Sequence, residues 1–175
     1  TKRYSYLGPV GTFTWEALGQ VAHAKGQDWV SVHNVGEALD DVLAGRSDYA
    51  MIAIENSIEG GVSATQDALA MAPELRIVGE YMVPVRFVLA VKPGLSLENV
   101  TTVAAHAVAY AQCRRWLEAH LPQHSHVPAR SNVHAAQSIV DDGVADAAVA
   151  TPGITSHAGV EVVAEDIGHN PYAQT

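Results

Sequence analysis

The sequence is poor in cysteine and in positive charge, and it has no long hydrophobic run. Its single cysteine, Cys113, excludes an internal disulfide and a thiolate metal cluster. Only 10 Lys and Arg residues stand against 19 Asp and Glu, a formal net charge of −9, and the adjacent Arg114 and Arg115 are too small a basic group to form a patch. Nucleic acid and anionic membranes demand a concentrated basic face. We therefore expect neither as a partner.

The N-terminal residues TKRYSYLGP contain no apolar stretch long enough for a signal peptide or a membrane span. Together with the lone cysteine, this predicts a cytoplasmic protein. Hydrophobic residues make up 48% of the 175 residues and charged residues 17%, so burial can offset conformational entropy. The chain is long enough for one large domain or two small lobes.

Short β-rich runs alternate with longer segments of helical periodicity. This pattern predicts an α/β fold in which crossover helices join parallel strands. Residues 76–94 form a long β-rich stretch, interrupted at Pro84, that we expect to cross between lobes. The expected strands are 4–8, 29–32, 49–54, 100–105, 125–129, 145–151 and 160–167, and the expected helices are 12–26, 35–45, 60–72, 108–121 and 132–143.

The densest polar cluster directly follows one of these strands. Residues 49–54 are apolar at nearly every position, which predicts a central strand covered on both faces. Glu55, Asn56 and Ser57 then fall at its carboxyl end, where ligands bind in open α/β sheets. The alternative is a turn capped by Asn56 and Ser57, with Glu59 facing water. We favour the functional interpretation because of the strand-end position.

Three turns rich in Gly, Ser or Thr precede predicted helices, at residues 8–14, 60–65 and 129–136. Helix starts expose unpaired N–H groups that attract carboxylates or phosphates, although helix capping alone also explains any one of them. Because cations are scarce, a small dianionic ligand would need such backbone donors. No turn ends in Gly-Lys-Ser/Thr, and GPVGTF lacks the spacing of a dinucleotide fingerprint, so we expect no nucleotide cofactor.

Other polar residues permit simpler interpretations. Gln112 is either a hydrogen-bond donor in a cleft or an ordinary exposed helix residue, and Cys113 is expected to be a small buried apolar residue. His120, His124 and His126 are predicted to be solvated loop residues rather than metal ligands, because no carboxylate completes a recognised pattern. No nucleophile–histidine–acid order supports covalent catalysis.

Seven segments stand in the following order along the chain: YLGPVGTFTWEAL at 6–18, AIENSIEGGVSAT at 53–65, IVGEYMVP at 77–84, AHAVAYAQC at 105–113, ARSNVHAAQSI at 129–139, ADAAVAT at 145–151 and EDIGHNPYAQT at 165–175. Together they resemble the catalytic domain of prephenate dehydratase over essentially the whole chain. ENSIEGGV is the most specific piece. The resemblance implies a two-lobed α/β fold similar to type-II periplasmic binding proteins, with a cleft between a lobe of residues 1–80 plus 165–175 and a lobe of residues 81–164.

The resemblance also implies an activity: conversion of prephenate to phenylpyruvate, with loss of water and carbon dioxide, in phenylalanine biosynthesis. Such a carbon–oxygen lyase needs no metal or organic cofactor because aromatisation drives the reaction, and relatives form dimers or tetramers. Thr175 would assist loss of the hydroxyl group, while Glu55, Asn56 and Gln112 would orient the substrate. The substrate would be bound by Thr12, Phe13, Ser57, Gly61, Ser131 and Asn132. Its carboxylates would be bound by the helix starts at Thr12, Phe13, Ser131 and Asn132.

The sequence departs from the family pattern at four places. The family's Thr-Arg-Phe motif aligns its Thr with Thr175, so its Arg and Phe, and the regulatory domain that often follows, lie beyond the chain. Ala105 stands in place of the Ser of a Ser-His-Pro turn, Asn132 in place of Thr, and Arg86 in place of His. Arogenate dehydratase, prephenate decarboxylase and a non-catalytic module that binds a small carboxylate remain as alternatives.

Overall fold

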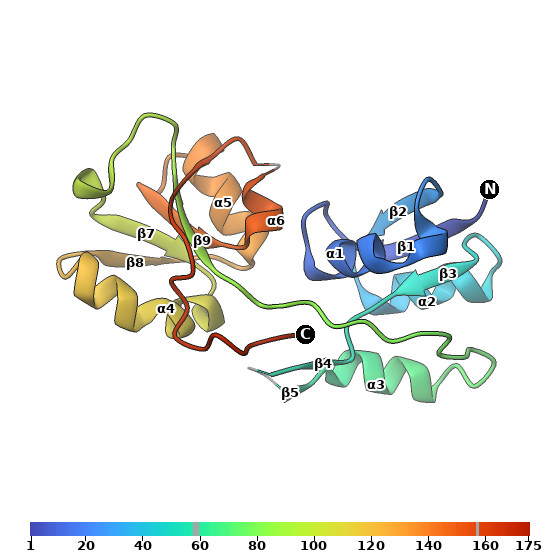
Figure 1. The fold of residues 1–175 in the computed structure, drawn as a ribbon. Helices are drawn as coiled ribbons and strands as arrows, with labels where there is room; N and C mark the ends of the chain where they lie inside the picture. The colour runs from blue at the N-terminus through green and yellow to red at the C-terminus, as the bar shows by residue number, and fades with distance from the viewer. Residues whose placement is uncertain (58–59, 157) are drawn as a thin grey trace. The chain divides into compact units, whose positions relative to one another are not determined.

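The structure, a computed structural model, describes residues 1–57, 60–156 and 158–175. The chain folds as two compact units, each with its own sheet and helices (Figure 1). Unit 1 contains Thr1–Pro84 together with Ala173–Thr175, and unit 2 contains Val85–Tyr172.

These boundaries differ from the expected ones in two places: residues 81–84 lie with unit 1 instead of unit 2, and residues 165–172 lie with unit 2 instead of unit 1. The strand that precedes them pairs with a strand of unit 2. The following turn stays there because the Ile167 N–H donates to the Phe87 carbonyl over 3.1 Å and the His169 N–H to the Gln112 carbonyl over 2.9 Å. Only the last three residues join unit 1.

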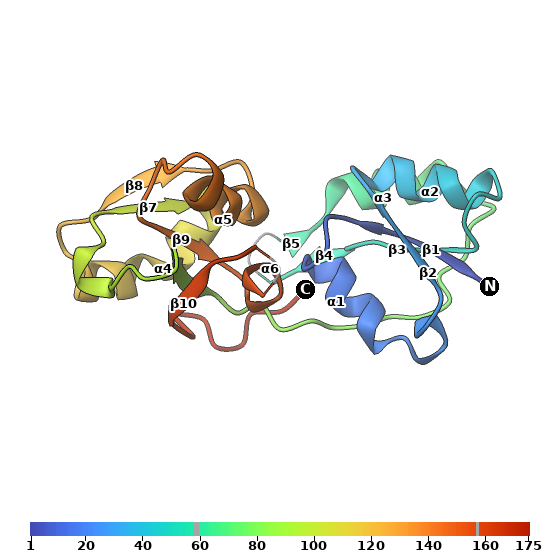
Figure 2. The same ribbon diagram turned by 90° about the horizontal axis from the view of Figure 1, so that it is seen from above.

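Unit 1 is built on a parallel sheet of three strands in the order β2-β1-β3. Figure 2 shows α1 on one side of this sheet and α2 and α3 on the other. The elements are β1 (Arg3–Leu7), α1 (Phe13–Gln20), a 3-10 turn (Ala22–Ala24), β2 (Asp28–Val32), α2 (Val35–Leu43), β3 (Tyr49–Met51), β4 (Glu55–Asn56), β5 (Gly60–Gly61) and α3 (Ser63–Ala70).

The core of unit 1 is aromatic. Tyr4 and Tyr6 on β1 are each 3% exposed and pack with Leu18 of α1. The rings of Tyr4 and Tyr49 stack at a centroid distance of 4.9 Å, which joins β1 to β3. Alternate β1 residues point to opposite faces. Ser5, on the other face of the strand, is therefore buried under α2, where its hydroxyl donates to Asp41 over 2.9 Å.

The prediction of a central strand at 49–54 was wrong. β3 is a short edge strand next to β1 and ends at Met51, and Ile54 is 46% exposed. β1 takes the central position because β2 and β3 both pair with it. The rest of the apolar run leaves the sheet and holds the start of α3, where the Thr65 hydroxyl donates to the Ala53 carbonyl over 2.5 Å.

Unit 2 contains a sheet of five strands in the order β10-β6-β9-β7-β8. Strands β7, β8 and β9 are parallel to one another, whereas β6 is antiparallel to both of its neighbours. Figure 1 shows α4 and α5 on opposite faces of this sheet. The elements are β6 (Val88–Val91), a 3-10 turn (Leu97–Asn99), β7 (Thr102–Ala105), α4 (Ala107–His120), β8 (Ser125–Pro128), α5 (Asn132–Asp141), β9 (Ala147–Ala150), α6 (Pro152–Thr155) and β10 (Glu161–Ala164).

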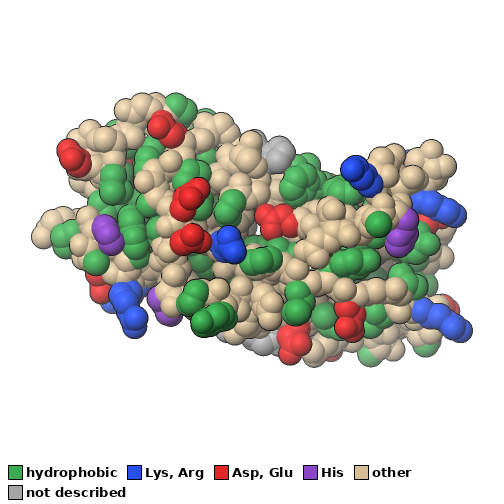
Figure 3. Space-filling view, viewed as in Figure 1, with side chains coloured by type: hydrophobic (Ala, Val, Ile, Leu, Met, Phe, Trp, Pro, Cys, Tyr) green, Lys and Arg blue, Asp and Glu red, His purple; other side chains and the backbone are tan. Residues whose placement is uncertain are grey.

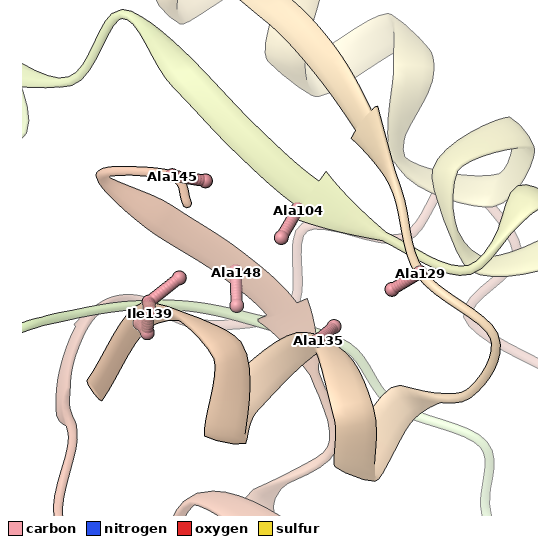
Figure 4. Close-up of a cluster of buried hydrophobic side chains, with 6 residues drawn as sticks. All are labelled: Ala104, Ala129, Ala135, Ile139, Ala145 and Ala148. Carbon is pink, nitrogen blue, oxygen red and sulfur yellow. The ribbon is translucent and has the colours of Figure 1, made fainter. Parts of the chain in front are cut away.

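The core between α5 and the sheet is made almost entirely of alanine. Figure 4 shows Ile139 with five alanines, and it places Ala135 beside the carboxyl end of β9. Small side chains let a helix approach a sheet closely, which keeps the first turns of α5 near the strand ends. The six residues are Ala104, Ala129, Ala135, Ile139, Ala145 and Ala148.

The long β-rich stretch expected at 76–94 is a strand only at Val88–Val91, with an isolated bridge between Pro84 and Gln174. Ile77 and Val78, 61% and 76% exposed, pack into neither sheet. A proline lacks the N–H that a sheet ladder needs, which limits Pro84 to a single bridge. Apolar side chains suggested that the strand begins at residue 76, but the backbone forms no ladder before Val88.

Candidate functional site

In unit 1 the chain turns sharply just after β3, and the polar cluster of residues 55–57 lies at this turn. Glu55 and Asn56 form β4 and pair with the backbone of Gly61 and Gly60 in β5. Ile58 and Glu59, including the predicted solvent-facing carboxylate, lie outside the described residues. Glu55 is exposed and Asn56 is half-buried. The hairpin therefore presents these residues beyond the sheet instead of burying them.

The C-terminal residues are hydrogen-bonded to this hairpin. The Ser57 hydroxyl donates to the Gln174 carbonyl over 2.7 Å and accepts from the Gln174 N–H over 2.6 Å. Thr175 exchanges two backbone hydrogen bonds with Val83, at 2.9 and 2.8 Å, and its hydroxyl donates to the Glu55 carbonyl over 3.1 Å. Residues more than one hundred positions apart in sequence thus form one cluster: Glu55, Ser57, Gln174 and Thr175.

The start of α1 lies at the same sheet edge, because the carboxyl ends of parallel β1 and β3 face the same way. Thr12 precedes the helix, but its hydroxyl donates to the Leu7 carbonyl over 2.7 Å and does not cap the helix. The Thr14 hydroxyl donates to the same carbonyl over 2.6 Å. What this turn offers an anion is therefore its backbone N–H groups, beginning at Phe13, and not the Thr12 side chain.

Glu16, one turn into α1, is a titratable group that sequence reasoning did not single out. Burial raises the pKa of the Glu16 carboxyl above its usual value. Cys113 in unit 2 is fully buried, as predicted, and burial raises the pKa of its thiol to about 12. The thiolate form that reacts with electrophiles is therefore suppressed at neutral pH.

In unit 2 three helices begin at one edge of the sheet. β7, β8 and β9 are parallel, and α4, α5 and α6 each begin within four residues of the strand that precedes them. The His106 Nδ1 accepts a 3.3 Å hydrogen bond from the Val108 N–H and so caps α4. Ala105, the residue before it, is fully buried at the end of β7.

The start of α5 holds Ser131 and Asn132. The Ser131 hydroxyl accepts a hydrogen bond from the His134 N–H over 2.9 Å, which is ordinary N-capping. Asn132 is half-buried, and its Oδ1 is buried with no hydrogen-bond partner among the described residues. Arg130, the residue before Ser131, is an exposed cation. Ser131 therefore serves the helix, whereas the Asn132 amide is left available.

Gln112 is half-buried on α4, and its backbone is engaged with the segment that follows β10. Its carbonyl oxygen accepts from the His169 N–H over 2.9 Å and lies 2.6 Å from His169 Nδ1. These bonds anchor residue 169 to α4. They leave the Gln112 side-chain amide outside that contact.

The prediction of solvated loop histidines at 120, 124 and 126 holds only in part: His120 is exposed but lies in α4, His124 lies in a loop but is half-buried, and His126 is half-buried on β8. His120 belongs to α4 and stacks on Trp116 at 4.2 Å. His126 stacks on Tyr110 at 3.9 Å, and the Tyr110 hydroxyl lies 2.8 Å from His124 Nε2. Among the described residues no three His, Cys, Asp or Glu side chains are arranged to hold a metal ion.

Each unit thus gathers part of the predicted site. Unit 1 brings together the hairpin, the C-terminal threonine and the α1 start, whereas unit 2 holds Gln112 on α4 and Ser131 and Asn132 on α5. Figure 3 shows Lys and Arg side chains spread over the face in view instead of gathered into one patch. At these helix starts the backbone N–H groups and the Asn132 amide remain available to an anion.

The sequence of residues 4–175 matches the family model described as prephenate dehydratase. The chain belongs to the prephenate dehydratase family. It is 44% identical over 184 residues to the prephenate dehydratase of Mycolicibacterium vanbaalenii, a match that covers 98% of this chain and 59% of that protein. The chain therefore spans less than two thirds of that relative's length.

Solved structures agree with this assignment. Prephenate dehydratase from Arthrobacter aurescens, solved in complex with L-Phe, superposes with a TM-score of 0.88 at 44% identity, covering 98% of this chain and 57% of that one. An ABC transporter periplasmic substrate-binding protein from Coxiella burnetii superposes with a TM-score of 0.51 at 14% identity, covering 100% and 83% of the two chains, and shows the fold alone. The predicted periplasmic-binding-protein-like α/β fold is thereby confirmed.

Two residues within these prephenate dehydratase motifs were not singled out from the sequence. Gln174 holds Ser57 through its backbone, a contact with no local sequence signal. Thr151 directly follows β9, and its hydroxyl is buried without a partner among the described residues. The expected strand ended at Thr151, whereas β9 ends at Ala150. With the observed strand end, Thr151 is the first residue after the strand, the position by which Glu55 was selected.

No described helix is both long and apolar enough to cross a membrane.

Proposed function

We propose that the chain catalyses the decarboxylation and dehydration of prephenate to phenylpyruvate, as a carbon–oxygen lyase. The observation that carries the proposal is the match of residues 4–175 to the prephenate dehydratase family, together with the seating of Thr175 against the ENS hairpin, residues 55–57. The chain spans just over half of each family member described above, so the activity of this portion is what needs testing.

The reaction consumes one proton. Prephenate dianion and H⁺ give phenylpyruvate monoanion, carbon dioxide and water. The bond from the ring to its carboxylate breaks and leaves its electron pair in the ring, the carbon–hydroxyl bond breaks, and the ring becomes aromatic. The protein must stabilise the charge that develops on the departing oxygen and hold the two carboxylates in place.

Thr175 is suited to assist the departing hydroxyl group. Its hydroxyl donates to the Glu55 carbonyl over 3.1 Å, and its backbone is fixed on both sides by Val83. Because a hydroxyl hydrogen rotates about its C–O bond, the donor can turn from the Glu55 carbonyl to the leaving group without any backbone movement. Fixing the donor in advance lowers the cost of reaching the transition state.

The carboxylates are assigned to the helix starts. The starts of α1, from Phe13, and of α5, at Asn132, each follow a strand of their own sheet and carry backbone N–H groups at the positive end of the helix dipole. Glu55, Asn56 and Gln112 orient the ring, while Ser57 and Gly61 shape the hairpin that supports Thr175. We place the enzyme in the cytoplasm as a homo-oligomer of two or four chains.

The decisive experiment compares Thr175→Ala and Thr175→Ser with the parent chain, each with and without the family's Arg-Phe after residue 175. Phenylpyruvate formation from prephenate is followed by ultraviolet absorbance. We expect Thr175→Ala to lower kcat by about 10²–10⁴-fold with KM changed less than about threefold, because the hydroxyl acts mainly in the transition state. Thr175→Ser keeps the hydroxyl and should retain most of the activity.

Mass analysis of the products separates the alternatives. Phenylpyruvate from prephenate supports the proposal, phenylalanine formed preferentially from arogenate indicates arogenate dehydratase, and a product that keeps the hydroxyl indicates a decarboxylase. Calorimetric binding of prephenate with no product, in both lengths of the chain, would show a binding module and refute the enzymatic proposal.

A further inference from the structure

Unit 2 contains two buried polar atoms that lack hydrogen-bond partners among the described residues: Asn132 Oδ1 and Thr151 Oγ1. Thr151 is only 2% exposed, so little bulk water reaches its side chain. Buried polar side-chain atoms in folded proteins are nearly always hydrogen-bonded to protein, ordered water or ligand. Two such atoms near one sheet edge therefore indicate a partner outside the described residues of unit 2.

The two residues flank one small apolar cluster. Ala150, the last residue of β9, packs with Ala136 and Ile154, and Val133 packs against the same cluster. Asn132 directly precedes Val133, and Thr151 directly follows Ala150. Figure 4 shows the carboxyl end of β9 lying beside the first half of α5, at Ala135. Thr151 is thus held at the first turns of α5.

The start of α5 supplies further donors. Ser131 pairs with the His134 N–H, which leaves the N–H groups of Asn132 and Val133 with no partner within the helix. α5 has 10 residues, so its dipole places partial positive charge at this point. α6 is a helix of only 4 residues. Its contribution is only to fix Thr151 at its N-cap position.

We propose that Thr151 is a further substrate-binding residue, whose hydroxyl joins the Asn132 amide and the first N–H groups of α5 in holding one carboxylate of the substrate. The inference rests on the proposed function and deepens it by naming the group that unit 2 binds. The Thr151 hydroxyl donates to one carboxylate oxygen. The Asn132 amide turns about its two-fold terminal torsion and presents its NH₂ to the other.

A carboxylate fits better than a phosphate. Its two oxygens lie in one plane and match a hydroxyl donor and an amide donor on either side, with the helix N–H groups between them. A phosphate carries more charge and is usually bound by several cations. Arg130, the cation beside this helix start, is exposed to solvent instead of being buried in the site. The proposed ligand class is therefore a small carboxylic acid such as a 2-oxo acid.

The test uses Thr151→Val, which keeps the shape and removes the hydroxyl, and Thr151→Ser, which keeps the hydroxyl. Dissociation constants for prephenate and for phenylpyruvate are measured by calorimetry on the full 175-residue chain, and KM and kcat by the absorbance assay. We expect Thr151→Val to raise Kd and KM by about tenfold, the usual loss for one hydrogen bond to a charged group, with kcat changed less than about threefold. Thr151→Ser should stay within about threefold of the parent.

Thr155→Val is the matched control. Thr155 is a buried threonine of the same short helix, but its hydroxyl already donates to the Pro152 carbonyl over 3.0 Å. It should bind both ligands like the parent chain. Asn132→Asp adds a second probe, because a carboxylate at this position repels a bound carboxylate and should weaken binding by more than tenfold.

The outcomes separate this inference from the proposed function. Unchanged Kd in Thr151→Val would overturn the inference and assign the unpaired atoms to a buried water, even if the enzyme is active. Tighter binding in Asn132→Asp would also overturn it, since the group bound beside residue 132 would then be a hydrogen-bond donor or a cation instead of a carboxylate. If the parent chain binds phenylpyruvate but forms no product, the proposed function fails while the Kd series still supports or refutes the subsite. If the parent binds neither ligand, both proposals are refuted.

Discussion

At the scale of single residues, most hydroxyl groups in the proposed sites already have partners within their own unit. Ser57 is bonded to Gln174, Ser131 to His134 and Thr12 to Leu7. Removing one of them would change backbone geometry as well as any contact with a ligand. Thr151 is the contrasting case, since no described group pairs with its hydroxyl. A substitution that removes the Thr151 hydroxyl therefore reports on ligand binding, whereas removing one of the other hydroxyls also breaks a hydrogen bond within the protein.

Asp41 gives the clearest pH dependence. Hydrogen bonds from the Arg46 guanidinium, at 2.9 Å, and then from the Ser5 hydroxyl hold the pKa of the Asp41 carboxyl below its usual value. Because the folded-state pKa lies below that of the unfolded chain, the carboxylate stabilises unit 1 above about pH 4, and this contribution is lost as the pH falls toward the folded-state pKa.

We therefore expect the urea midpoint of the parent chain to fall more between pH 7 and pH 3 than that of Asp41→Asn. Tryptophan fluorescence follows the unfolding, because Trp15 and Trp29 both pack in the core of unit 1. Asp40→Asn, an exposed neighbour on the same helix, is the control and should keep the parent's pH dependence. Equal slopes for the parent and Asp41→Asn would contradict the assignment.

At the scale of elements, helices begin where parallel strands end, and this shared edge brings short motifs into contact. The turn after β1 depends on a close approach to β2, where the Gly8 N–H donates to the Val32 carbonyl over 3.0 Å. A Cβ atom on Gly8 would lie 1.9 Å from Ser31 Oγ and 2.7 Å from Ser31 Cβ. Glycine is needed at residue 8 because no side chain fits beside Ser31.

Gly8→Ala should lower the free energy of unfolding by about 1–3 kcal/mol through this overlap. Ser31→Gly removes the atoms in conflict, so the double variant should recover most of the loss, giving a coupling that a denaturation cycle measures. Gly19→Ala is the matched control: nothing lies within 4 Å of a Cβ there, and alanine favours the helix. Additive effects of Gly8→Ala and Ser31→Gly would rule out the proposed overlap.

At the scale of the whole molecule, unit 1 is discontinuous in sequence. Its last three residues arrive after the chain has completed unit 2, and they bond to Ser57 and Val83. Closing a loop over such a separation carries an entropic cost, which the hydrogen bonds of this three-residue addition must offset. The threonine proposed to act in catalysis is held by this addition.

Deleting residues 173–175 should leave unit 2 intact and loosen one edge of unit 1. In hydrogen exchange, the amides of Ser57 and Val83 lose the carbonyls of Gln174 and Thr175 and should exchange at least tenfold faster. The amides of β7 and β9 in unit 2 serve as internal controls and should keep their protection. Unchanged exchange at the Ser57 amide would contradict the prediction that residues 173–175 protect it.

Sequence reasoning succeeded where information is local. The alternation of elements, the helix starts and the burial of Cys113 follow from propensity, capping and hydropathy within a few residues. It failed at 49–54 and 76–94, where apolar composition suggested a central strand and a long strand. Apolar residues fit an edge strand or an extended segment equally well until the neighbours are known.

The sequence by itself determined the α/β class and, through its ordered motifs, membership of the prephenate dehydratase family. These depend on the identity and spacing of nearby residues, which a linear chain carries completely. The tertiary structure alone decided that β1 is the central strand of its sheet, that Thr175 meets Glu55, and that Asn132 and Thr151 keep unpaired atoms. Each depends on contacts between residues far apart in the chain, whose free energies exist only once both partners are folded into place.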